Sequence, residues 1–183
     1  MSTTFPRARN SRKGYDIEQV EDFLEEARRA YAAEPGSPVV VSSASIRTMA
    51  FELEKGGYSA VHVDAALERL EDAFAGRERE RAIQTQGDEA WYGEARRTAQ
   101  EILNRLARPA GHRFDRVSFL SKGYHRKDVD AFAERLTQYF QQGKPLSVDE
   151  VRTAVFRQKS GGYRETQVDY LLDSVIAIML AVR

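Results

Sequence analysis

The chain has 183 residues, with 28 basic side chains, 28 acidic side chains and no cysteine. A formal net charge of zero argues against non-specific nucleic-acid binding, which needs a basic surplus. The missing cysteines exclude disulfide scaffolds and thiolate metal sites. The longest apolar run covers only residues 175–182, whereas a membrane span needs about 20 residues. We therefore expect a soluble, cytoplasmic protein made of helices that each bury one apolar stripe.

Helical periodicity accounts for most of the first half. Asp16 is a good N-cap for a helix whose apolar positions run from Ile17 to Tyr31 and which Pro35-Gly36 ends. Ser42 or Ser43 caps a second predicted helix that continues through residue 53. A third begins at Ser59. Residues 60–107 form either one helix or two, and Gly87 favours a break near 85–88.

The second half is expected to repeat this pattern. Helices are predicted from about residue 126 and over the apolar C-terminal stretch, with Gly143-Lys144-Pro145 as a linker between them. Short extended segments are expected at residues 39–41 and 116–119. The predicted fold class is all-α.

A Gly-Tyr pair occurs four times, each followed by Val six residues after the Gly and by an acid seven residues after it. The pairs are Gly14-Tyr15, Gly57-Tyr58, Gly123-Tyr124 and Gly162-Tyr163, and the acids are Glu21, Asp64, Asp130 and Asp169. The first and third motifs resemble each other, and so do the second and fourth. Internal repeats of this kind decide the architecture. They predict two pseudo-repeated units of helix, Gly-Tyr turn and helix, packed together.

We place the units at residues 1–108 and 109–183. The first contains motifs near 5–31 and 43–75 and a linker helix at 88–107, and the second contains motifs near 114–142 and 147–182. We interpret the motif residues as structural. Gly57 and Gly162 are expected to have positive φ, and each Tyr ring to pack between helices with its hydroxyl on a backbone carbonyl. The acids are expected to be held by backbone N–H groups and the helix dipole. Roles in recognition for the tyrosines and in catalysis for the acids are the alternatives.

These motifs resemble the DivIVA-domain family, most closely its small multi-repeat branch, and residues 51–67 and 156–172 fit best. The resemblance implies a non-enzymatic scaffold of bacterial cell division or polar growth, which gathers at the septal or polar inner membrane and recruits other proteins. It also implies a helix pair that continues into a parallel coiled coil. This chain has no sustained heptads. It also lacks an apolar residue at the two positions before each motif Gly, where the family's membrane-inserting Phe-Arg lies.

The remaining candidates are binding surfaces. Weak headgroup contact is predicted for the basic residues Arg7, Arg9, Arg12 and Lys13. Trp91 and Tyr92, and Ile178 and Met179, are either core residues or a partner interface. The alternating charges of Arg77 to Arg81 predict a solvated helix face.

No residue pattern indicates an enzyme, a cofactor or a metal site. Gly-Gly-Tyr lacks the spacing of a phosphate loop. His62 and Asp64 point to different sides of a helix. We expect an adaptor whose helix faces bind other proteins, with homo-oligomerisation left open. The alternative is a helix-turn-helix regulator of nucleic acid. The second helix of each pair argues against it, because its expected exposed positions are largely acidic and would repel a phosphate backbone. These positions are Glu68, Glu71, Asp72, Glu165 and Asp173.

Overall fold

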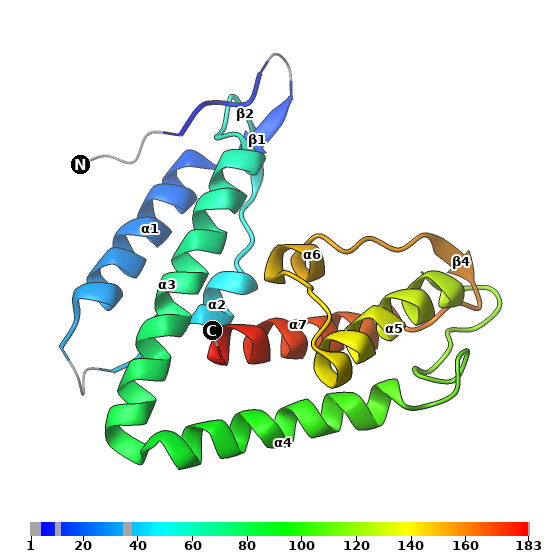
Figure 1. Cartoon of the computed structure of the whole chain (residues 1–183). Coiled ribbons are helices and arrows are strands. Elements are labelled where there is room, and N and C mark those ends of the chain that lie inside the picture. Colours follow the sequence, from blue (N-terminus) through cyan, green and yellow to red (C-terminus); the bar gives the residue numbers. More distant parts are fainter. Residues whose placement is uncertain (1–4, 10–11, 35–37, 183) are drawn as a thin grey trace. The chain divides into compact units, whose positions relative to one another are not determined.

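The computed structural model describes residues 5–9, 12–34 and 38–182, so the Pro35-Gly36 stop signal lies outside the described residues. Within them the chain is mainly helical, as the sequence predicts, with two small sheets added (Figure 1). The helices are α1 (Ile17–Ala32), α2 (Ser43–Arg47), α3 (Ala60–Gln86), α4 (Asp88–Leu106), α5 (Arg126–Gln142), α6 (Val148–Arg152) and α7 (Glu165–Ala181). The strands are β1 (Lys13–Tyr15), β2 (Leu53–Lys55), β3 (Lys122–Tyr124) and β4 (Gln158–Ser160).

Two compact units make up the chain, Met1–Thr85 and Gln86–Arg183. The division therefore falls at residue 85 rather than at the expected residue 108, because α4 packs on α5 and α7. Ile102 and Leu106 of α4 are buried. Gly87, with φ of 85°, separates α3 from α4, so the stretch 60–107 forms two helices.

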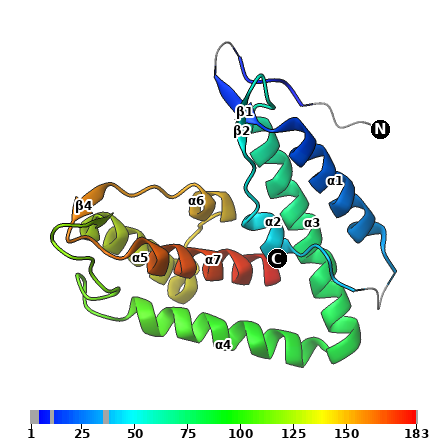
Figure 2. The same cartoon turned by 180° about the vertical axis from the view of Figure 1, so that it is seen from behind.

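In the first unit, α1 and α3 begin at one small sheet and extend away from it side by side (Figures 1 and 2). Strands β1 and β2 are antiparallel, with Gly14 opposite Glu54. The predicted N-cap is confirmed: the Asp16 carboxylate accepts a hydrogen bond of 2.9 Å from the Gln19 N–H. Val20, Phe23, Val63, Leu67 and Phe74 form much of the core.

The second unit has the same order of elements, with α4 added. Strands β3 and β4 are antiparallel, with Gly123 opposite Lys159. Helix α5 follows β3 and α7 follows β4, and both α4 and α6 pack on α7. Val129, Leu136, Val168 and Val175 are buried in this unit.

Two local predictions are wrong. The second helix ends at Arg47 instead of continuing through Leu53, which lies in β2 and is half exposed. Pairing with β1 is a tertiary interaction, and it overrides the helical spacing of this segment. Strands β1 and β3 contain a Gly-Tyr pair, and β2 and β4 end two residues before one. No strand lies at residues 39–41 or 116–119, where only Arg116 forms an isolated bridge.

The Arg77–Arg81 run is not a solvated face. Arg77 and Arg81 donate hydrogen bonds of 2.7 and 2.9 Å to the Ala33 carbonyl at the end of α1. The Glu78 carboxylate accepts from the N–H and the hydroxyl of Ser43, at 2.8 and 2.6 Å. The alternating charges thus fasten α3 to the two ends of the connection between α1 and α2.

Candidate functional site

The backbones of Gly14-Tyr15 and Gly57-Tyr58 lie against each other. The Tyr15 N–H donates to the Tyr58 carbonyl and the Tyr58 N–H to the Tyr15 carbonyl, each at 2.8 Å. A Cβ on Gly14 would lie 2.6 Å from the Gly57 carbonyl oxygen, and one on Gly57 would lie 2.8 Å from the Gly14 oxygen. Only glycine permits this approach, because the atoms in the way belong to the backbone.

The second unit contains the same exchange. Tyr124 and Tyr163 donate to each other's carbonyls at 3.0 and 2.8 Å. The expected positive φ lies one residue earlier, at Gly56 (77°) and Gly161 (65°), so the prediction for Gly57 and Gly162 is wrong. Gly57 and Gly162 must be glycine because a Cβ there would overlap backbone atoms of the opposite motif. Gly56 and Gly161 favour glycine because their φ is positive.

Each tyrosine side chain is held by residues of the opposite motif. The Tyr58 hydroxyl donates to Glu21 Oε1 at 2.5 Å, and its ring meets the edge of Phe5 with centroids 5.4 Å apart. The Tyr163 hydroxyl donates to Asp130 Oδ1 at 3.0 Å. The acceptors are therefore carboxylates rather than the expected backbone carbonyls.

The other two tyrosines follow the same rule. Tyr15 stacks edge-on with Phe51 at 5.5 Å, and burial, the charge of Asp64 and its hydrogen bond raise the pKa of the tyrosine. Burial, the charge of Asp169 and its hydrogen bond likewise raise the pKa of Tyr124, to about 12. The hydroxyls therefore stay protonated to a higher pH than that of an unperturbed tyrosine.

We call each such pair of motifs a lock: the first lock joins Tyr15 and Tyr58, and the second joins Tyr124 and Tyr163. In a lock, each motif supplies one Phe and one acid to the tyrosine of the other. The phenylalanines are Phe5 and Phe51 in the first lock and Phe114 and Phe156 in the second. The repeat spacing identified the Phe, Tyr and acid of each motif, but it did not indicate that their contacts cross between motifs.

Two buried charged residues, Arg113 and Glu71, form ion pairs that the sequence did not indicate. Arg113 donates to the Leu106 carbonyl at 2.9 Å and to the Asp130 carbonyl at 3.0 Å, and it pairs with the Glu134 carboxylate. It thereby joins the end of α4 to α5. Glu71, expected on an exposed acidic face, is buried and accepts from Arg47 Nε at 2.7 Å.

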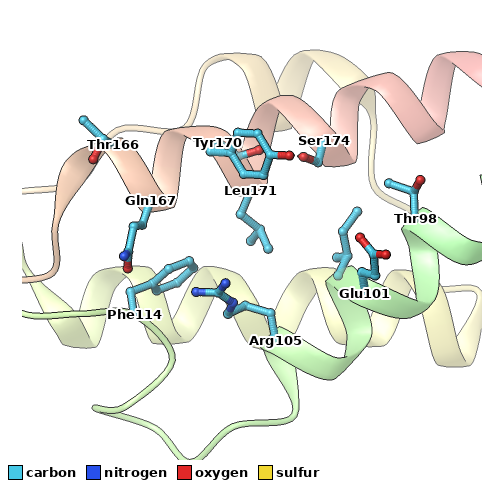
Figure 3. A pocket seen from close by; sticks show the side chains of 10 residues that line it. Thr98, Glu101, Arg105, Phe114, Thr166, Gln167, Tyr170, Leu171 and Ser174 are labelled. Atoms are coloured by element: carbon cyan, nitrogen blue, oxygen red, sulfur yellow. The ribbon is translucent and has the colours of Figure 1, made fainter.

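A groove of about 360 Å³ opens between α4 and α7 in the second unit (Figure 3). It is lined by Thr98, Glu101, Ile102, Arg105, Phe114, Thr166, Gln167, Tyr170, Leu171 and Ser174. Ile102, Phe114 and Leu171 are buried and form an apolar floor. Tyr170 is 75% exposed at the rim, and the Arg105 guanidinium lies 5.9 Å from the centre of the Phe114 ring. An apolar hollow with a few polar rim groups is a common form of binding site.

A second exposed feature precedes β3. Phe119 and Leu120 occupy a turn closed by a 2.9 Å hydrogen bond from the Ser121 N–H to the Ser118 carbonyl. Their exposures are 78% and 81%. The tip lies three and four residues before Gly123, outside the two positions at which the family has its apolar residue, so the sequence did not predict it.

The other predicted site residues are dispersed. Arg7 Nη1 donates to the Gly56 carbonyl at 3.0 Å, while Arg9, Arg12 and Lys13 are exposed. Trp91 is half-buried, with its Nε1 donating to the Ala181 carbonyl at 3.2 Å, and Tyr92 is exposed. Ile178 and Met179 are buried, in keeping with the core alternative.

Among residues 5–9, 12–34 and 38–182, no three His, Asp or Glu side chains gather into a candidate metal site. No helix in this part of the chain is both long and apolar enough to cross a bilayer. Comparison of the chain with protein-family models, curated proteins and solved structures found no match.

Proposed function

We propose that this protein is a non-enzymatic adaptor of bacterial cell division or polar growth, and that it binds partner proteins through helix faces. The observation that carries the proposal is the pair of locks. In each lock the tyrosine hydroxyls and the acids bind one another. The motifs therefore act as structural joints, and the groups most suited to chemistry are occupied.

The joints leave other surfaces available. Helices α1 and α3 begin at the first lock, and α5 and α7 begin at the second. The α4–α7 groove and the exposed Tyr170 give the second unit a surface that another protein chain can cover. Two units in one chain also raise the effective concentration of one partner near another, which is what an adaptor requires.

The resemblance of the motifs to the DivIVA-domain family supports a septal or polar site on the inner face of the membrane. Exposed Arg9, Arg12 and Lys13 would add weak attraction to anionic headgroups, about 1 kcal/mol for each charge. The proposed membrane contact is peripheral and comes from the basic segment of the first unit.

Nucleic-acid binding is a poorer interpretation. A helix-turn-helix joins its two helices by a short turn, but here β2 lies between α2 and α3, and β4 lies between α6 and α7. No helix pair in the described part of the second unit has that short connection around Gly162.

The proposal is tested by following a fluorescent fusion in the bacterium that encodes the protein. We expect foci at septa or poles. A uniform cytoplasmic signal from a stable fusion would contradict the role in cell division. Salt-sensitive retention of the purified protein on DNA would support the nucleic-acid-binding alternative.

The membrane contribution is tested separately with Arg12→Glu. We expect weaker foci and weaker sedimentation with vesicles of anionic phospholipid. Arg29→Glu makes the same charge change on an exposed position of α1 and serves as the matched control. Equal effects of the two variants would show that the basic segment has no specific part in the contact.

A further inference from the structure

The Phe119-Leu120 tip is an apolar projection that the second unit holds in place. Besides the Ser118–Ser121 hydrogen bond, the Ser121 carbonyl accepts from the Gly161 N–H at 3.1 Å. A Cβ on Gly161 would lie 3.8 Å from the Phe119 Cα, so the turn rests against the end of β4. Two adjacent apolar side chains are thus presented to solvent on a supported turn. Such preorganisation lowers the ordering cost of binding.

The α4–α7 groove offers the complementary shape. Its floor is apolar and its rim carries the exposed ring of Tyr170 (Figure 3). Tyrosine is enriched among the residues that carry most of the binding energy at protein interfaces, and such residues become buried when the partner covers them. The groove has room for side chains of the size of Phe or Leu, since its volume is about 360 Å³.

The charges beside the two features are also complementary. Lys122 lies next to the tip and is exposed, and Glu101 is exposed on the groove rim. Neither has an ion-pair partner within the described part of the chain. The formal net charge of zero leaves no overall repulsion between two molecules.

We propose that the Phe119-Leu120 tip of one molecule docks in the α4–α7 groove of a second molecule, with Lys122 facing Glu101. Tip and groove are different surfaces, so a single contact joins unlike patches. Two such contacts make a closed dimer, and one contact per neighbour makes a growing series. Either form gives the proposed adaptor a means of gathering at one place. Only the biological role of this self-association rests on the proposed function. The self-association itself is measured on the purified protein, without reference to localisation.

The experiment measures the mass of the full chain by sedimentation equilibrium over a range of concentrations. We expect association by the wild type. Phe119→Ser and Tyr170→Ala should each weaken it at least about tenfold, as loss of an aromatic hot-spot residue does at an interface. Val155→Ser is the matched control, because Val155 is 92% exposed in the same unit but does not line the groove. All three side chains are solvent-exposed, and circular dichroism verifies that the variants fold.

Mixing the two defective variants makes the test specific. The tip of the Tyr170→Ala protein is intact, and so is the groove of the Phe119→Ser protein, so the mixture should recover one contact and form 1:1 pairs. Glu101→Lys and Lys122→Glu should likewise fail alone and associate with each other.

Three results overturn the proposal. The first is a wild type that stays monomeric at every concentration. The second is association of Tyr170→Ala as strong as that of the wild type, which would place the tips against each other. The third is Phe119-dependent binding of the monomeric chain to vesicles of anionic phospholipid, which would assign the tip to lipid. A diffuse fluorescent fusion with intact self-association would refute the division role alone.

Discussion

Replacing Gly162 by alanine is the most direct test of the lock. The new Cβ would lie 2.5 Å from the Tyr124 carbonyl oxygen and 2.6 Å from the Gly123 carbonyl carbon and oxygen. These are backbone atoms, so no side-chain rotation can relieve the overlap. The two motifs must move apart, and the reciprocal hydrogen bonds between Tyr124 and Tyr163 lengthen or break.

The magnitude follows from these losses. Two backbone hydrogen bonds contribute about 1 kcal/mol each, and forcing an extra carbon into a packed site costs about 1–3 kcal/mol. The lower entropy of the unfolded alanine chain offsets at most about 1 kcal/mol. We expect the free energy of unfolding of the second unit to fall by about 2–4 kcal/mol.

Gly161→Ala is the matched control at the adjacent position. Here φ is 65° and the nearest atom to a new Cβ is 3.8 Å away. The cost is only that of a left-handed conformation, about 1–2 kcal/mol. The neighbouring glycines therefore separate the effect of space from the effect of backbone conformation.

Urea unfolding followed by tryptophan fluorescence provides the assay. Trp91 is the only tryptophan, and it lies in the second unit, where its ring binds the end of α7. The signal thus reports the unit that contains the mutation, even when the two units unfold separately. If Gly161→Ala proves more destabilising than Gly162→Ala, or Gly162→Ala is neutral, the close approach of the motifs is not what stabilises this unit.

Two further predictions concern the tyrosines. Tyr163→Phe removes the 3.0 Å hydrogen bond to Asp130 from a fully buried ring and should lower the free energy of unfolding by about 1–2 kcal/mol in the same assay. Tyr170→Phe, on an exposed ring, should be neutral, and equal losses would contradict the prediction. For Tyr124, burial and then Asp169 raise the pKa to about 12, so the folded state favours the neutral phenol. The stability that this pKa shift contributes to the folded state is complete below the unfolded pKa of about 10, and it is lost as pH rises from there toward 12. The urea midpoint of the wild type should fall over that interval more steeply than that of Tyr124→Phe, and parallel curves would refute the assignment.

Local features were predictable because their causes are local. The Asp16 cap requires only a carboxylate within reach of an N–H one turn away. Gly87 interrupts a long helical pattern because glycine adopts a positive φ without strain. The apolar spacing also identified most buried helical positions, including Val63 and Val168.

Errors arose where a residue's role depends on a distant segment. Leu53 has helical spacing, yet pairing with Tyr15 places it in a strand. Glu71 looks like a surface acid until Arg47 approaches it from α2. The groove beneath Tyr170 is made by α4 together with α7, which are far apart in the sequence.

The sequence by itself determined most of the helices and the regular spacing of Phe, Gly-Tyr, Val and acid, because these depend on contacts within a few residues along the chain. The tertiary structure alone decided that each tyrosine is held by the Phe and acid of the opposite motif. The spacing of one motif is compatible with either arrangement, within a motif or between two. The choice is made when Gly14 meets Gly57 and Gly123 meets Gly162, since only paired glycines allow the backbones to approach closely enough for the exchange.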